Sequence, residues 1–133
     1  MSSSERAWEP IFPGDGVSTA RGAYSPAVRA GDLVFVSGQV PRDAATGELK
    51  GADVAEQTRY TLEKLDGVLR AVGGSLDDVV SVTAYLHDIG EWDAFNRVYK
   101  EVFRDPYPTR TTVGAQLGDV LVEISAVAYL PRR

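Results

Sequence analysis

The sequence predicts an α+β fold in which two helices cover one face of a mixed β-sheet. Apolar residues recur every three or four positions in two stretches, residues 54–72 and 92–103, as they do along amphipathic helices. Residues 22–40, 79–86 and 109–130 are rich in β-branched residues and interrupted by turn signals, which is typical of strands. The resulting order of two strands, helix, strand, helix and two strands contains two strand–helix–strand units.

The beginning of the chain divides into an arm and a hairpin. Residues 1–20 show little periodicity and are interpreted as an arm, ordered only where Trp8 or Phe12 packs against the rest. A turn composition at residues 30–32 joins two β-branched runs and predicts a hairpin. We therefore expect residues 21–133 to form a single domain, which is long enough to bury its own core.

The first helix carries its own start and stop signals. Asp53 and Glu56 are spaced for a capping box, and Gly73 with Gly74 is expected to end the helix. The apolar stripe between these signals comprises Val54, Thr58, Leu62, Leu65, Leu69 and Val72. The second stripe is richer in aromatic residues and comprises Trp92, Phe95, Val98, Tyr99, Val102 and Phe103.

The last strand has one fully apolar face and one mixed face. Alternate residues from Val120 to Leu130 are all apolar, whereas the other face mixes apolar groups with Glu123. If both helices cover the first face, the second stays uncovered in a single chain and is too apolar to remain so. This pattern predicts burial against other subunits.

Composition excludes several kinds of chemistry. The chain has no cysteine, so disulfides, thiolate metal sites and cysteine nucleophiles are excluded, and a reducing cytoplasmic location is expected. A net charge of −5 opposes attraction to nucleic acid and to anionic membranes. No stretch resembles a signal peptide or a membrane helix. No metal-ligand cluster or phosphate-binding loop is recognisable.

Arg110 and Glu123 are the most informative charged pair. Pro106 and Pro108 stiffen the approach to Arg110, which enters a β-branched run. The two residues lie near the starts of two strands that are expected to be neighbours across a short turn. A structural cross-strand ion pair and a functional pair, with Arg110 on a substrate carboxylate and Glu123 on water, fit the spacing equally well.

The other polar candidates are ambiguous by themselves. Tyr24 fits a packed aromatic as well as a site residue, and Ser37 fits an ordinary hydroxyl at a strand end. Asn96 lies in the middle of the second helix, where it can turn inward to bond a backbone group. His87, the only histidine, is interpreted as a capping or surface residue rather than a catalytic one.

Five segments together resemble the reactive intermediate deaminase (Rid) family. They are AYSPAVRAGDLVFVSGQVP, AEQTRYTLEKLDGVLRAVGGSLDDVVSVTAYLHD, FNRVYKEVF, PTRTTVG and VEISAVAYL. The resemblance runs from about Gly22 to Tyr129, with the motifs in the family's order. It implies a chorismate-mutase-like fold assembled as a homotrimer, with pockets at the clefts between subunits. It also implies hydrolysis of 2-imino acids, and of the enamines that tautomerise to them, to 2-keto acids and ammonia without a cofactor.

The resemblance assigns roles to individual residues. Arg110 corresponds to the arginine that holds the substrate carboxylate, and Glu123 to the glutamate that positions or activates water. The remaining correspondences are Tyr24 as the pocket tyrosine, Ser37 with Gly38 as the lining at a strand end, and Asn96 as a residue near the pocket.

Three features depart from the family pattern. Thr112 stands where many members carry cysteine and is assigned to the substrate pocket in its place. The loop between Arg110 and Glu123 looks shorter than in common members, and Ser125 replaces a frequent second glutamate. Imine hydrolysis needs no thiol, so these departures bear on substrate preference more than on the core chemistry.

Two other functions remain as alternatives. The same cleft could bind a keto acid or related carboxylate without catalysis, or the trimer could act as a holding chaperone. A ribonuclease activity, the label attached to some relatives, is disfavoured by the negative net charge and by the presence of a single histidine.

Overall fold

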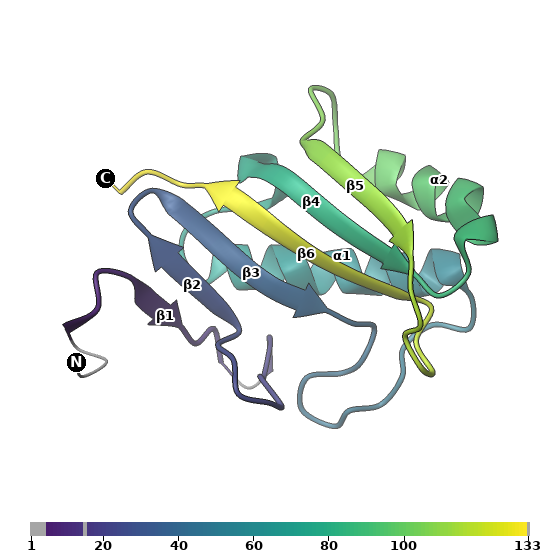
Figure 1. Cartoon of the computed structure of the whole chain (residues 1–133), viewed down its shortest axis with the longest axis horizontal. Coiled ribbons are helices and arrows are strands. Elements are labelled where there is room, and N and C mark those ends of the chain that lie inside the picture. Colours follow the sequence, from purple (N-terminus) through teal and green to yellow (C-terminus); the bar gives the residue numbers. More distant parts are fainter. Residues whose placement is uncertain (1–4, 15, 133) are drawn as a thin grey trace.

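A computed structural model of the chain, which describes residues 5–14 and 16–132, contains one six-stranded sheet with two α-helices on one face (Figure 1). The strands are β1 (Glu9–Ile11), β2 (Ala27–Ala30), β3 (Leu33–Gln39), β4 (Val79–Leu86), β5 (Thr109–Gly114) and β6 (Val122–Tyr129). The helices are α1 (Val54–Arg70) and α2 (Trp92–Val102). A short 3-10 turn, η2 (Leu76–Asp78), precedes β4, and a second one, η3 (Ile89–Glu91), precedes α2. The predicted α+β class is confirmed.

The hairpin forms where the sequence placed it, and the arm contributes a strand. β2 and β3 pair antiparallel, with Ala30 opposite Leu33. Gly31, between them, has φ +61°, a left-handed conformation that glycine adopts without a Cβ clash. β1 then pairs with β2 and becomes the sheet edge. Of the two expected anchors, Phe12 was wrong, because it is 74% exposed, whereas Trp8 is 36% exposed. The arm packs on the core through Ile11 and Val17.

The C-terminal strand lies at the centre of the sheet. The strand order is β1-β2-β3-β6-β4-β5, so β6 pairs antiparallel with both β3 and β4. β4 and β5 are parallel and are joined through α2. A strand between β3 and β4 covers both of their edges, which would otherwise expose unpaired backbone groups. β5 is left as the second edge of the sheet, next to α2.

Local signals define the ends of α1. The Asp53 carboxylate accepts a hydrogen bond from the backbone N–H of Glu56 at 2.9 Å, as expected of an N-cap. The carboxylate of Glu56 bonds the N–H of Ala52 at 2.7 Å, one residue before the partner of a standard capping box. At the other end the N–H of Gly74 bonds the carbonyl of Leu69 at 2.9 Å, while Gly73 has φ +86°.

Both helices cover the same face of the sheet, and the core lies between them and the strands (Figure 1). The apolar face of β6 is buried, as the alternation predicts: Val122, Ile124, Ala126 and Ala128 are at most 6% exposed. Within the chain no element covers the opposite face among the described residues. Its large apolar side chains include Phe35 at 43%, Val80 at 46% and Tyr129 at 52% exposure. We call this surface the uncovered face.

Candidate functional site

Arg110 is the second residue of β5, and its side chain points toward the helix layer. β5 begins directly after Pro108, so the stiffened approach lies where the sequence indicated. In the parallel pairing of β4 with β5, Arg110 lies beside Val82, a core residue that is 2% exposed. Residues paired across two strands present their side chains to the same face. Arg110 therefore extends from the sheet edge toward α2.

An amide and aromatic rings hold the guanidinium of Arg110. Its Nη1 donates a hydrogen bond to Oδ1 of Asn96 at 2.9 Å. The central guanidinium carbon lies 4.5 Å from the ring centre of Tyr99, and 5.4 Å from those of Trp92 and Phe95. Such cation–π contacts position a guanidinium without neutralising it. Among the residues the structure describes, no carboxylate forms a salt bridge with Arg110, so its charge is available to a ligand.

A cavity of about 370 Å³ opens beside this guanidinium. It is lined by Asn96, Tyr99, Lys100, Tyr107, Pro108 and Arg110. Two of these side chains are cations and none is acidic, which suits a small carboxylate. We call this space the arginine cavity.

Two buried hydroxyl groups lie near Arg110 without a hydrogen-bond partner among the described residues. One is the phenol of Tyr99, whose ring lies under the guanidinium; burial raises the pKa of this phenol to about 12. The other is Oγ1 of Thr112, two residues after Arg110 on the same face of β5. Both oxygens are shielded from solvent, so the donors and acceptors of these hydroxyls stay unused among the described residues.

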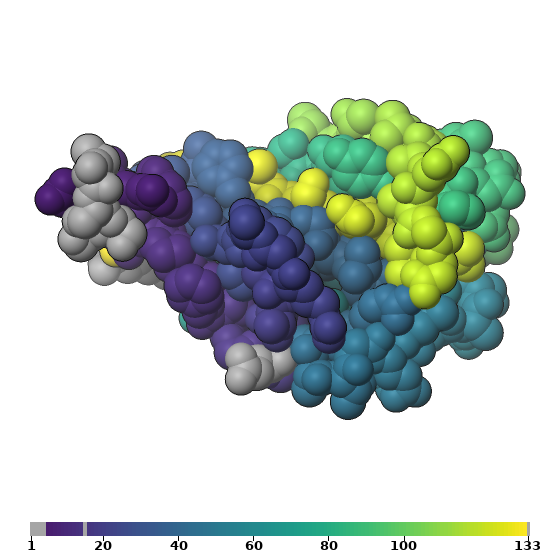
Figure 2. All heavy atoms as spheres, turned by 60° about the horizontal axis from the view of Figure 1, so that its bottom comes forward, coloured from purple at the N-terminus to yellow at the C-terminus, as the bar shows by residue number. Residues whose placement is uncertain are grey.

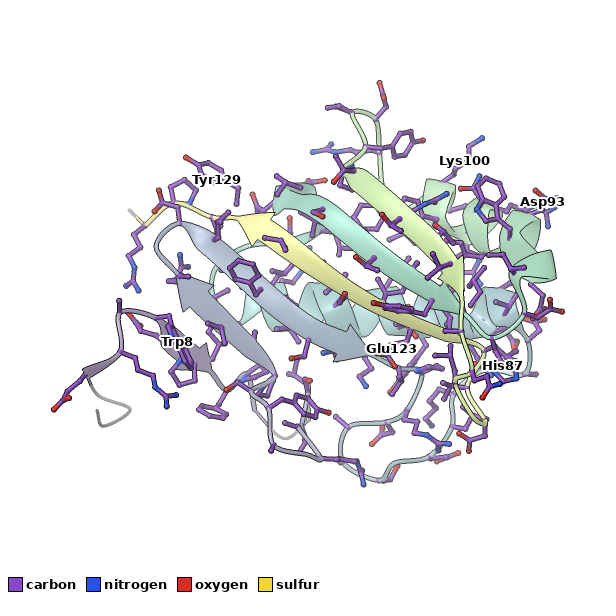
Figure 3. The ribbon with its side chains drawn as sticks, viewed as in Figure 1. Trp8, His87, Asp93, Lys100, Glu123 and Tyr129 are labelled. Atoms are coloured by element: carbon purple, nitrogen blue, oxygen red, sulfur yellow. The ribbon has the colours of Figure 1, made fainter. Side chains whose placement is uncertain are left out.

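Glu123 lies on the uncovered face, where β6 passes the end of β3 (Figure 3). It is opposite Tyr85 in the antiparallel pairing of β4 and β6. Gly38 lies directly beneath its side chain: a Cβ built on Gly38 would be 2.3 Å from Oε2 of Glu123. Only a glycine leaves room for the carboxylate in this position.

Tyr24 and Ser37 surround the same strand end. The hydroxyl of Ser37 donates to the carbonyl of Ser25 at 2.7 Å, which ties the loop after Tyr24 to β3. Tyr24 is 53% exposed and its hydroxyl accepts from the backbone N–H of Arg21 at 3.4 Å. Tyr24 and Gly38 line one cavity. We call Tyr24, Ser37, Gly38 and Glu123 the glutamate cluster.

The expected adjacency of the strands that carry Arg110 and Glu123 is wrong. β4 lies between β5 and β6. The pairing partners Val82 and Tyr85 are three residues apart on β4, so Arg110 and Glu123 also point to opposite faces of the sheet. A cross-strand ion pair between them within one chain is therefore ruled out. The predicted residues form two groups, Arg110 with Asn96 and Thr112 on one side and the glutamate cluster on the other.

His87 lies outside both groups of site residues and has a structural role. His87 accepts a hydrogen bond from the backbone N–H of Leu117 at 3.1 Å and thereby supports the loop before β6. Within residues 5–14 and 16–132, no group of three or more acidic or histidine side chains is arranged to hold a metal ion. In the same part of the chain, no helix is long and apolar enough to cross a membrane.

The chain matches proteins of one family along most of its length. Residues 17–130 match the family model described as Endoribonuclease L-PSP. A RutC family protein of Pyrococcus abyssi is 42% identical over 95% of this chain and 93% of its own. The 3-aminoacrylate deaminase RutC of Acinetobacter baylyi is 37% identical over 92% of this chain and 98% of its own.

A solved structure supports the same assignment. The crystal structure of E. coli TdcF with bound serine has a TM-score of 0.82 and 35% identity, covering 91% of this chain and 98% of that chain. The chain therefore belongs to the endoribonuclease L-PSP family, together with RutC and RidA proteins. The resemblance to reactive intermediate deaminases drawn from the sequence is confirmed.

Sequence reasoning missed the residues that surround the predicted ones. Trp92 and Tyr99 were assigned to an apolar stripe, but their rings also contact the guanidinium of Arg110. The arginine's aromatic setting needs the packing of β5 beside α2, which no local pattern reveals. Arg21 and Lys64, in the cavity beside Tyr24, were also missed, because they lie far apart in the sequence and only the tertiary fold brings them together.

Proposed function

We propose that this protein hydrolyses 2-imino acids, and the enamines that tautomerise to them, to 2-keto acids and ammonia. The observation that carries the proposal is Arg110, a guanidinium held by Asn96 and three rings beside a cavity and free of any carboxylate partner in the described chain. Such a group suits the carboxylate that every 2-imino acid carries. Relatives named 3-aminoacrylate deaminase and reactive intermediate deaminase support the same class of chemistry.

The two groups of site residues meet only if the protein assembles. Arg110 and Glu123 face opposite sides of one sheet, so a substrate held by Arg110 of one chain can reach Glu123 only on another chain. Contact between the β5 edge of one copy and the uncovered face of the next is head-to-tail, and such contacts form a ring when the rotation between copies closes. The exposed Phe35 and Tyr129 give that face the apolar character of a subunit interface. A homotrimer with three inter-subunit clefts is the assembly we propose.

The proposed reaction needs orientation, a water molecule and proton transfers. Arg110 binds the substrate carboxylate through the N–H groups that Asn96 does not occupy. The carboxylate of Glu123 takes a proton from water as its oxygen attacks the iminium carbon, giving a tetrahedral carbinolamine. Glu123 then returns the proton to nitrogen. As the C–N bond breaks and ammonia leaves, the hydroxyl group gives its proton to the Glu123 carboxylate and becomes the C=O of the keto acid, and the released ammonia takes this proton from Glu123 as ammonium. Tyr24 donates or accepts a hydrogen bond at the attacking oxygen.

Imine hydrolysis can be followed directly. An amino-acid oxidase generates 2-imino acids in place, and semicarbazide traps the imine that survives. We expect the wild type to accelerate imine loss, and Arg110→Ala to lose at least about 100-fold in kcat/KM because the carboxylate anchor is gone. Arg97→Ala, which removes an exposed arginine of α2, is the matched control and keeps wild-type kinetics. Wild-type protein that accelerates the loss of no small, branched or aromatic imine contradicts the proposal.

The same assay separates catalysis from binding alone. The TdcF relative was solved with bound serine, an observation that favours a carboxylate-binding function as the second candidate. A pure binding protein would take up pyruvate in an Arg110-dependent way without accelerating imine loss. A chaperone would tolerate Arg110→Ala without change in either assay.

A further inference from the structure

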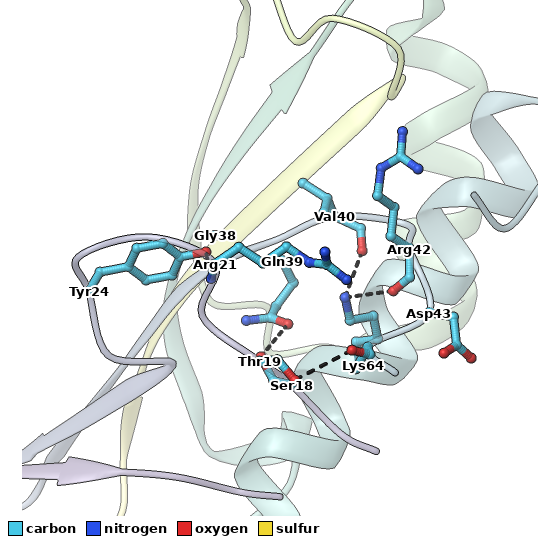
Figure 4. Close-up of a pocket in the computed structure, with 11 residues that line it drawn as sticks. Ser18, Thr19, Arg21, Tyr24, Gly38, Gln39, Val40, Arg42, Asp43 and Lys64 are labelled. Carbon is cyan, nitrogen blue, oxygen red and sulfur yellow. Dashed lines mark hydrogen bonds between the residues drawn. The ribbon is translucent and has the colours of Figure 1, made fainter. Parts of the chain in front are cut away.

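A second cavity, of about 80 Å³, lies next to the glutamate cluster (Figure 4). Its walls come from the segment before β2, the end of β3, the loop that follows β3, and α1. Figure 2 shows these segments side by side, the early residues in dark blue against the loop of residues 40–51 in lighter blue. The cavity contains three cations, Arg21, Arg42 and Lys64, but only one carboxylate, that of Asp43. This excess of positive charge occurs in a chain whose net charge is −5.

Two of these four charged groups, Arg42 and Asp43, already have partners within the protein. Arg42 donates to the carbonyl of Gly47 at 2.8 Å and forms a salt bridge with Asp119. The carboxylate of Asp43 accepts hydrogen bonds from the backbone N–H groups of Ala45 and Thr46, both at 2.9 Å, and these bonds lower its pKa. Neither group needs a further partner. Arg21 and Lys64 therefore carry the free positive charge of the cavity.

Arg21 is positioned but unpaired. Its guanidinium has no hydrogen-bond or salt-bridge partner in residues 5–14 and 16–132. It lies against Gly47 so closely that a Cβ there would be 3.0 Å from its Nη2 atom. Gly47 has φ +76°, so the backbone at this point also requires glycine. Arg21 is exposed, and its guanidinium lies beside Gly47 of the loop with its donors unused by the described residues.

Lys64 approaches the cavity from α1 and retains one unused donor. Its ammonium group donates to the carbonyls of Val40 at 3.0 Å and Arg42 at 2.9 Å, as Figure 4 shows. An ammonium group has three N–H donors, which leaves one for a ligand. Partial burial lowers the pKa of Lys64, and an anion in the cavity would counter that effect. Both free cations are thus poised for one negative group.

The cavity adjoins the glutamate cluster, although Glu123 itself does not line it. Tyr24 and Gly38 line it, and Gly38 also touches Glu123. We infer that a substrate whose imine carbon lies over Glu123 directs its side chain past Tyr24 into this space. The cavity is then a subsite for a second carboxylate, and the preferred substrates are dicarboxylic 2-imino acids. The inference rests on the proposed function for the reaction, but the binding of a second carboxylate can be tested apart from it.

Calorimetric titration of two keto acids of equal chain length gives the test. We expect 2-oxoglutarate to bind about 10- to 100-fold more tightly than 2-oxopentanoate, because only the former supplies a second carboxylate for charge-assisted hydrogen bonds. In Arg21→Leu the ratio of the two affinities falls toward one, and in Arg21→Lys it is partly kept. Arg70→Leu makes the same change in charge at an arginine that pairs with Asp66 outside the cavity, and leaves the ratio unchanged.

The outcomes distinguish the subsite from the proposed chemistry. Equal affinity for the two keto acids, a preference that survives Arg21→Leu, or no binding of 2-oxoglutarate overturns the subsite. The corresponding imines, made from glutamate and norvaline, test the reaction in parallel. Arg21-dependent binding of the dicarboxylate without loss of either imine would overturn the deaminase function and leave the subsite standing. Equal turnover of both imines, unaffected by Arg21→Leu, would overturn the subsite and leave the deaminase function standing.

Discussion

Gly38→Ala tests whether the position of Glu123 matters, because it displaces the side chain and leaves the carboxylate group itself intact. The new Cβ would lie 2.3 Å from Oε2, 2.9 Å from Cδ and 3.1 Å from Cγ of Glu123. The closest of these contacts is about 1 Å shorter than ordinary van der Waals contact, so the side chain must move by a comparable distance. A displacement of about 1 Å at a catalytic group costs on the order of 100-fold in rate. We therefore expect kcat/KM for imine hydrolysis to fall by about that factor.

The fold should tolerate this substitution. The atoms that clash belong to the flexible end of one side chain, and Gly38 does not occupy the left-handed region. Moving Glu123 to a poorer rotamer costs about 0.5–1.5 kcal/mol, and the loss of chain entropy in the unfolded state offsets part of it. The free energy of unfolding should thus change by no more than about 1 kcal/mol in urea titrations.

A matched glycine provides the control. A Cβ on Gly16 meets no atom within 4 Å and its φ is not positive, so Gly16→Ala should change neither activity nor stability. Wild-type kcat/KM in Gly38→Ala would refute the reasoning, because it would mean that the position of Glu123 is irrelevant to the reaction. Unfolding of the variant would refute the statement that the side chain absorbs the clash.

Three further substitutions test other parts of the account. Asn96→Ala removes the amide that fixes Arg110 at 2.9 Å and should raise KM about 10-fold with a smaller effect on kcat; an unchanged KM would contradict its positioning role. Phe35→Glu charges the uncovered face and should give single chains by light scattering with loss of activity, whereas an active assembly would argue against that interface. For Tyr99, burial raises the pKa of the phenol from 10.0 to about 12. The contribution of the neutral phenol to the free energy of unfolding is therefore present below pH 10 and is lost as pH rises toward 12. Tyr99→Phe should reduce this alkaline loss in denaturant titrations, and an identical pH profile would contradict the assignment.

The elements were predictable because local signals agree with the packing. The stripe of α1 and the alternation of β6 match the buried residues of the structure, and Asp53, Gly73 and Gly74 mark the helix ends as expected. In these segments the periodicity of one element fixes which side is buried. Helix and strand identity therefore followed from the sequence.

The arrangement of strands was harder to predict because pairing is a long-range choice. A short turn follows β5, and consecutive strands are often neighbours, yet β6 inserts between β3 and β4 and covers two edges at once. That choice separates Arg110 from Glu123 and turns one expected site into two groups of residues. The cavity cations Arg21 and Lys64 are even farther apart in sequence than Arg110 and Glu123, so no local pattern brings them together.

A mixing experiment measures most directly whether the active site is shared between chains. Arg110→Ala and Glu123→Gln each remove one group, and we expect each assembled variant to be inactive by itself. Equal amounts of the two, unfolded together and refolded, should recover about one quarter of wild-type activity, since that fraction of interfaces pairs an intact Arg110 with an intact Glu123. An inactive mixture of normally assembled chains would contradict a site built from Arg110 of one subunit and Glu123 of the next.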